Sequence, residues 1–207
     1  MKSSFLILLD CDGVIADFLT PTLEFVKNKT GQEFTHTHIT EWDIFKSIGM
    51  ADMWKDFHEF ASKKNFCAKI KPYTGSQAGV ARLRLVGDVY VVTSPLATPH
   101  WCFERTQWCE KHFELGKPNV IHAEAKYMVM GDVLIDDKYE NILSWVATNP
   151  YGTGLLFDRP YNQMHECGEG NRIVRVKSWE EILLRVEKIK LEKIVRVNAG
   201  PCEWGCK

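Results

Sequence analysis

Two acidic side chains, one residue apart, follow the first apolar run of the chain. Asp10 and Asp12 come after residues 5–9, Phe-Leu-Ile-Leu-Leu, and Gly13 comes next. Alternate residues of an extended segment point to the same side, so both carboxylates can face one site. One carboxylate can attack phosphorus, and the other can transfer protons as general acid and base. Taken alone, the pattern is equally typical of a strand followed by an acidic turn.

Two later apolar segments also end in polar pairs, Thr93-Ser94 and Asp136-Asp137. Right-handed connections bring the carboxyl ends of parallel strands to one edge of a sheet, where ligands bind. The three sets of polar residues can therefore converge. Lys126 lies ten positions before the second acidic pair and can reach the same edge.

This set of side chains predicts a metal-assisted phosphoryl-transfer site. Two like charges ~4 Å apart repel by about 4 kcal/mol at an effective dielectric constant near 20, and a bound cation removes that cost. All-oxygen ligands select a hard ion, for which we predict Mg²⁺. Hydroxyl groups, backbone N–H groups and a lysine suit a phosphate.

Each part also has a purely structural interpretation. Thr93-Ser94-Pro95 is typical of a turn, and a lone Lys126 is typical of a solvated surface. Asp137 with Glu140 is the pattern of a capping box at a helix start.

The elements that must position these groups alternate between strands and helices. This alternation predicts an α/β fold with a parallel sheet covered on both faces. The segments that we expect to be strands are 5–9, 89–92, 119–121, 133–135, 155–157 and, at an edge, 173–176. The expected helices are 77–85, 98–113, 139–147 and a last one that Ser178 and Glu181 cap, with 197–207 as a loop.

Residues 17–73 differ in composition, because they are rich in aromatic side chains at helical spacing and contain no convincing strand. We predict a helical cap domain over 17–73, inserted into a core domain made of 1–16 and 74–207.

Composition excludes several classes of protein. With 207 residues, 45% of them hydrophobic, the chain can bury one substantial core. A formal charge of −1 predicts no nucleic acid polymer and no anionic membrane as partner. The apolar start is too short for a signal peptide, so we expect a cytoplasmic protein with its seven cysteines reduced.

The four motifs Asp10-x-Asp12-Gly-Val, Thr93-Ser-Pro, Lys126 and Asp136-Asp together resemble those of the haloacid dehalogenase (HAD) superfamily of phosphatases. More narrowly, the run Asp-Cys-Asp-Gly-Val-Ile-Ala-Asp-Phe at 10–18 and the spacing after Lys126 resemble the 5′(3′)-deoxyribonucleotidases. The resemblance covers most of the chain and implies a Rossmann-like sheet with a small helical cap after the first strand.

The resemblance also implies roles for individual residues. Asp10 would be the nucleophile, and Asp12 would be the general acid and base. Phosphate would be held by Thr93, Ser94 and Lys126. The Mg²⁺ ligands would be Asp10, the backbone carbonyl of Asp12, and Asp136, with Asp137 supporting the site.

The leading hypothesis is an enzyme that hydrolyses nucleoside or deoxyribonucleoside monophosphates through an aspartyl-phosphate. An alternative is a related phosphatase for another small phosphomonoester, such as a sugar phosphate. A non-enzymatic module that binds nucleotide or phosphate is an alternative of another class. Aromatic residues in the cap favour a base over a sugar, and we predict that Phe18 and Trp42 line the base pocket. The oligomeric state stays open, and a homodimer is compatible with the sequence.

Overall fold

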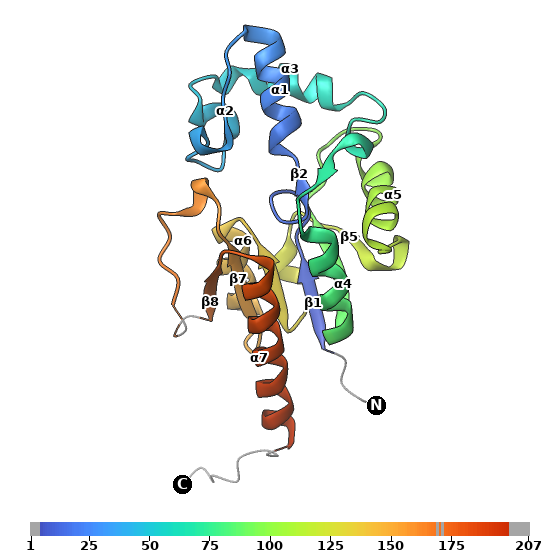
Figure 1. The fold of residues 1–207 in the computed structure, drawn as a ribbon, viewed down its shortest axis with the longest axis vertical. Coiled ribbons are helices and arrows are strands. Elements are labelled where there is room, and N and C mark those ends of the chain that lie inside the picture. Colours follow the sequence, from blue (N-terminus) through green and yellow to red (C-terminus); the bar gives the residue numbers. More distant parts are fainter. Residues whose placement is uncertain (1–4, 169, 171, 199–207) are drawn as a thin grey trace.

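The centre of the protein is a six-stranded sheet in the order β5-β4-β1-β6-β7-β8, in which every neighbouring pair is parallel (Figure 1). The computed structural model describes residues 5–168, 170 and 172–198. The strands are β1 Leu6–Leu9, β4 Asp88–Thr93, β5 Val120–His122, β6 Val133–Asp136, β7 Thr153–Phe157 and β8 Ile173–Val176. The predicted parallel α/β fold is therefore confirmed.

Helices cover both faces of this sheet, so the side chains of β1 are buried on both sides of the strand. Ile7 and Leu9 pack into the apolar cluster of one face, whereas Leu8 packs into the cluster of the other. A strand buried on both faces needs a continuous apolar run, which explains its sequence. The first face carries α4 Ser76–Val86, α5 Trp101–Phe113 and α7 Trp179–Asn198, and the second carries α6 Tyr139–Thr148.

Three helices stand beyond the carboxyl end of β1, at the top of Figure 1. They are α1 Leu19–Thr30, α2 Ile44–Ser47 and α3 Trp54–Ala61. Their own apolar cluster is centred on Val26, Phe45, Phe57 and Ala61. A cap domain needs a small core of its own such as this one. The predicted boundaries of the cap domain, 17–73, stay a prediction.

A short ribbon joins this helical part to the sheet. β2 (Ala16–Asp17) pairs antiparallel with β3 (Lys71–Pro72) where the chain leaves and re-enters the core. The prediction that 17–73 holds no strand is therefore wrong at its two ends. Two-residue strands are too short to produce a period-two pattern, so only the pairing reveals them.

Two helix boundaries in the structure also differ from those predicted from the sequence. α5 begins at Trp101 rather than at residue 98, because residues before it form a turn in which Trp101 N–H donates to the Thr98 carbonyl. α7 continues to Asn198, so the loop predicted for 197–207 is wrong at its first two residues. The remainder of that segment lies outside the described residues.

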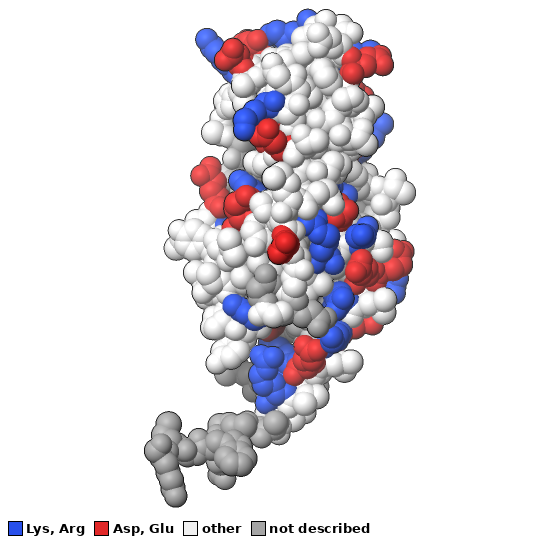
Figure 2. Space-filling view, turned by 90° about the vertical axis from the view of Figure 1, so that its left-hand side faces the viewer, with Lys and Arg blue, Asp and Glu red and all other residues white. Residues whose placement is uncertain are grey.

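Charged side chains of both signs are interspersed on the face that Figure 2 shows. This pattern agrees with the formal charge of −1. Within the described ranges, none of the helices combines the length and the apolar character that crossing a bilayer requires.

Candidate active site

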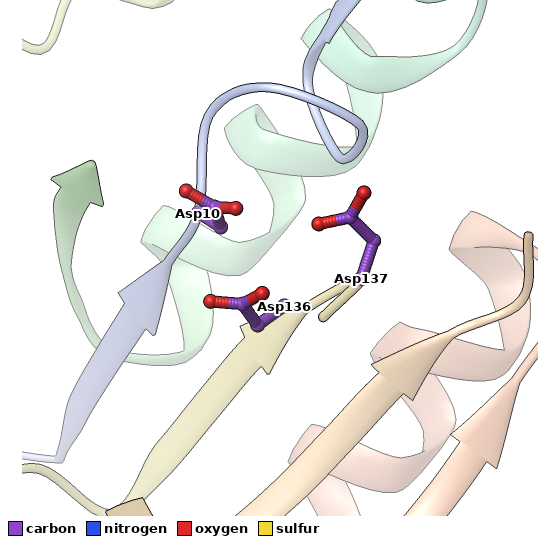
Figure 3. Close-up of side chains that lie close together, drawn as sticks. All are labelled: Asp10, Asp136 and Asp137. Carbon is purple, nitrogen blue, oxygen red and sulfur yellow. The ribbon is translucent and has the colours of Figure 1, made fainter. Parts of the chain in front are cut away.

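Three carboxylates meet at the carboxyl edge of the sheet, as Figure 3 shows. Asp10 follows β1, Asp136 ends β6, and Asp137 comes next. β1 and β6 are parallel neighbours, and the Asp10 N–H donates to the Ile135 carbonyl at 2.8 Å. One oxygen from each buried carboxylate lies within 4.8 Å of the other two. The structure thus brings these three predicted site residues together.

Gly13 makes the tight turn after Asp12 possible. Its φ is +80°, in the left-handed region that favours glycine. A Cβ at this position would lie 1.8 Å from Oδ2 of Asp137 and 2.9 Å from the hydroxyl of Tyr161. The glycine therefore lets the turn lie directly against the second acidic pair.

Lys126 connects the first and second acidic pairs. It begins a short 3₁₀ turn, Lys126–Met128, and its Nζ lies 2.6 Å from Asp10 Oδ1 and 2.8 Å from Asp136 Oδ2. Burial by itself lowers the pKa of a lysine, but these two carboxylates raise the pKa of Lys126 above its ordinary value. The side chain is only 2% exposed. The alternative of a solvated surface lysine is therefore wrong.

The backbone holds the same oxygen of Asp10 that contacts Lys126. Its Oδ1 also accepts the Cys11 N–H at 2.7 Å. Burial raises the pKa of Asp10, and the nearby Asp136 raises it further, against the opposing effect of Lys126. The nucleophile predicted from the sequence is thus a fixed and crowded carboxylate.

Asp136 and Asp137 have different surroundings. Asp136 accepts hydrogen bonds from Lys126 Nζ (2.8 Å), the Lys138 N–H (2.8 Å) and Asn141 Nδ2 (3.1 Å). Asp137 accepts one at Oδ2 from the Tyr161 hydroxyl. Its Oδ1 is buried and has no hydrogen-bond partner among the described residues. Burial, with a further contribution from Asp136, raises the pKa of Asp137 to about 7.

The alternative in which Asp137 and Glu140 cap α6 is wrong. The residue at the cap position is Lys138, and no side chain caps the helix there. The carboxylate of Asp137 instead faces Tyr161, whose position in the chain gave no signal of a role in the site.

Asp12 turns toward α5 and forms an ion pair that the sequence analysis missed. Arg105 Nη2 donates to both oxygens of Asp12, at 2.6 and 2.9 Å. Burial raises the pKa of Asp12, and the Arg105 guanidinium opposes that rise. The one available sign was helical spacing, because Arg105 shares a buried face with Trp101 and Trp108.

A cavity of about 450 Å³ opens over the carboxylates, between the sheet edge and the helical part that contains α1, α2 and α3. Thr93 is buried at the end of β4, whereas Ser94 is exposed and its Oγ donates to the Ala123 carbonyl at 3.5 Å. The predicted site residues that line the cavity are Asp10, Asp12, Phe18, Trp42, Thr93, Ser94, Lys126 and Asp137.

The aromatic residues of the cavity wall have different environments. Trp42 is 48% exposed, and the Lys138 Nζ lies 4.7 Å from its ring centroid. Phe18 packs edge-on against Phe57 and Trp101, with centroids 5.7 and 6.0 Å away. Both residues line the cavity, and their contact with a base stays a prediction. Phe18 also packs within the helical part.

Trp54 belongs both to the apolar cluster of the helical part and to the cavity wall. Its ring contacts Phe45, with centroids 4.8 Å apart, but Trp54 lines the cavity as well. Its indole N–H donates to Asp43 at 2.9 Å, which fixes the ring at the wall. Helical spacing alone cannot show which core residues border a cavity.

The family model described as 5′ nucleotidase, deoxy (Pyrimidine), cytosolic type C protein matches residues 4–190. The chain belongs to this family. It is accordingly a nucleotidase phosphatase, as the narrower sequence resemblance implied.

Relatives with curated names are about a quarter to a third identical to this chain over the aligned residues. A 5′(3′)-deoxyribonucleotidase of Bacillus subtilis is 27% identical over 177 residues, covering 85% of this chain and 95% of the relative. A putative 5′(3′)-deoxyribonucleotidase of Bordetella bronchiseptica is 31% identical over 173 residues, with 76% and 86% covered. The human cytosolic-type 5′(3′)-deoxyribonucleotidase is 29% identical over 152 residues, with 67% and 73% covered.

Solved structures share the fold of this family member at lower identity. A putative haloacid dehalogenase-like hydrolase from Burkholderia xenovorans superposes with a TM-score of 0.56 at 13% identity, covering 90% of this chain and 98% of that one. A hydrolase of the same superfamily from Xanthomonas campestris gives 0.55 at 12% identity, covering 93% and 98%.

Proposed function

We propose that this nucleotidase-family protein is a Mg²⁺-dependent phosphatase that converts deoxyribonucleoside or nucleoside monophosphates to nucleoside and phosphate. One observation carries the proposal. The buried carboxylate of Asp10 lines a cavity with an aromatic wall, and its neighbours are the cation Lys126 and two further carboxylates. The curated relatives named 5′(3′)-deoxyribonucleotidases support the substrate class.

In the proposed reaction an oxygen of Asp10 attacks phosphorus, and the bond from phosphorus to the nucleoside oxygen breaks. Asp12 gives its proton to that oxygen, which leaves an aspartyl-phosphate on Asp10. Asp12 then removes a proton from water, which attacks phosphorus and releases phosphate and the free carboxylate. Lys126, Thr93 and Ser94 would hold the phosphate oxygens during both steps.

The carboxylate cluster fits a hard divalent cation. All donors are oxygen atoms, and the buried Oδ1 of Asp137 lacks another partner within the described part of the chain. We propose Asp10, Asp136 and the backbone carbonyl of Asp12 as ligands of Mg²⁺, with Asp137 as a further candidate ligand rather than only a support. Bound there, Mg²⁺ would offset the negative charge that otherwise repels a phosphate.

A phosphate-release screen tests the proposal most directly. We expect deoxyribonucleoside monophosphates to be hydrolysed with Mg²⁺ at least tenfold faster than common sugar phosphates. A preference for a sugar phosphate would favour the related phosphatase hypothesis instead. If the protein hydrolyses none of these esters, the proposed activity is contradicted.

The first test of mechanism concerns Asp12. We expect Asp12→Asn to lower kcat for a deoxynucleotide by about 10²- to 10⁴-fold, the usual contribution of proton transfer. p-Nitrophenyl phosphate has a leaving group that needs little protonation, so its first step should suffer less. Rapid-quench measurement of nitrophenolate release isolates that step from the later attack of water. Equal loss of the first step for both substrates would count against Asp12 as the acid.

The second test concerns the aromatic wall. Stacking of a base contributes roughly 1–3 kcal/mol, so Trp42→Ala should lower kcat/KM for a deoxynucleotide by about 5- to 150-fold. Acetyl phosphate has no base, and its hydrolysis should change less than twofold. Because Trp42 is half-exposed, the substitution should leave the thermal midpoint nearly unchanged.

Phe18→Ala should act in the same direction, with an added loss of stability because the ring packs against the cap. If Trp42→Ala and Phe18→Ala slow acetyl phosphate as much as the nucleotide, both residues are structural and the base pocket lies elsewhere.

A further inference from the structure

The guanidinium of Arg105 is fixed on several sides within the core. It is fully buried and lies over the rings of Trp101 and Trp108, 4.9 and 5.3 Å from their centroids. Its Nη1 donates to the Cys11 sulfur at 3.1 Å, and its Nη2 donates to both oxygens of Asp12. Stacking and hydrogen bonding thus leave this cation little freedom to move.

Asp12 is the more exposed partner of the pair. Its side chain is 26% exposed and lines the cavity, and it lies in the turn between β1 and β2. Without Arg105, the carboxylate has other places to go, including the cationic Lys126 that lines the same cavity. In the structure the guanidinium holds both oxygens of the Asp12 carboxylate on the α5 side.

We propose that Arg105 is a positioning residue that holds the Asp12 carboxylate at the distance and angle from which it exchanges protons with the substrate. The proposal rests on the proposed function, in which Asp12 is the general acid and base. It adds a residue on α5, 93 positions further along the chain, that acts on the reaction only through Asp12.

The stability of the fold is a poor explanation for this arrangement. A buried ion pair often contributes no more stability than apolar side chains of similar volume, because both ions lose their hydration. The buried Nε of Arg105 also has no hydrogen-bond partner in the described part of the chain, which adds to that loss. A role in holding Asp12 explains why a charged arginine is buried among the apolar side chains of α5.

The neighbouring residue on α5 provides a matched control. Glu104 is also buried and charged, and its carboxylate accepts the backbone N–H groups of Asn65 (2.6 Å) and Ala68 (3.3 Å). Asn65 and Ala68 lie between α3 and β3, in the segment that leads from the helical part back to the sheet. Glu104 thus supports the structure from the same helix without touching Asp12.

A double-mutant cycle tests the proposal in the intact chain. Arg105→Lys keeps the charge but removes the planar guanidinium, whose Nη1 bond to Cys11 and contacts with the indole rings fix Nη2 against both oxygens of Asp12. We therefore expect kcat for a deoxynucleotide to fall by about 10- to 100-fold with KM changed less than about threefold. In an Asp12→Asn background the same substitution should change kcat by less than about twofold, because residues that act as one unit are not additive. Glu104→Gln should lower kcat by equal factors in both backgrounds.

Equal losses for Arg105→Lys in the two backgrounds would overturn the proposal and make Arg105 structural. A failure of the proposed function gives a different result. In that case the unmodified protein would not hydrolyse a deoxynucleotide, or the Asp12→Asn variant would keep full activity. If Arg105→Lys does not fold, Cys11→Ala removes one partner of the guanidinium and keeps the ion pair. We expect it to lower kcat by about two- to fivefold only when Asp12 is present, and an equal loss without Asp12 would overturn the proposal.

Discussion

Asp10→Asn is expected to lower kcat for every phosphomonoester by at least about 10³-fold, because a carboxamide is a poor nucleophile. The side chain is nearly isosteric, and its carbonyl oxygen can keep the hydrogen bonds from Lys126 and the Cys11 N–H. The substitution also removes one of three crowded negative charges. The fold should therefore persist, which a thermal melt and circular dichroism would verify.

A direct readout of the covalent step accompanies this prediction. Acid quenching during turnover should trap a protein that has gained one phosphoryl group, detected by intact mass, and Asp10→Asn should trap none. Activity of Asp10→Asn within tenfold of the unmodified protein would rule out the covalent mechanism. So would a phosphoryl group found on a different residue.

Removal of divalent cations is expected to abolish turnover, and added Mg²⁺ is expected to restore it. Asp10, Asp136 and Asp137 repel one another and any incoming phosphate, and Lys126 is the one cation that forms ion pairs with this cluster among the described residues. A divalent cation would supply the missing positive charge. Protein treated with EDTA that still turns over at full rate would contradict the prediction.

Binding of Mg²⁺ can be measured apart from activity. A ligand that binds only the folded state raises the thermal midpoint, so Mg²⁺ should stabilise the unmodified protein. Asp136→Ala should lose this stabilisation, whereas Lys126→Ala should keep more of it because lysine supplies no ligand. Asp132→Asn is the matched control, since Asp132 precedes the same strand and bonds Leu6 N–H and Lys193 at the opposite end. It should respond to Mg²⁺ like the unmodified protein.

The strands and the reactive groups at their ends were predictable because their causes are local. A strand buried on both faces is apolar over its buried part, as β1, residues 89–92 of β4 and residues 133–135 of β6 show. Asp10, Thr93 and Asp136 follow or end these strands, and parallel strands with right-handed crossovers bring such ends to one edge. The order of the motifs along the chain, together with the apolar runs that precede them, was therefore enough to predict that they converge at the carboxyl edge of the sheet.

The sequence by itself therefore determined the parallel α/β class, the position of the inserted helices and the residues at the sheet edge. The tertiary structure alone decided which side chains from elsewhere complete the site. Arg105 reaches Asp12 from 93 residues away, and Tyr161 reaches Asp137 from 24 residues away. The physical reason is that such contacts depend on how whole helices and loops pack. Helical spacing indicates that Arg105 shares a buried face, but it does not show which distant residue the side chain touches.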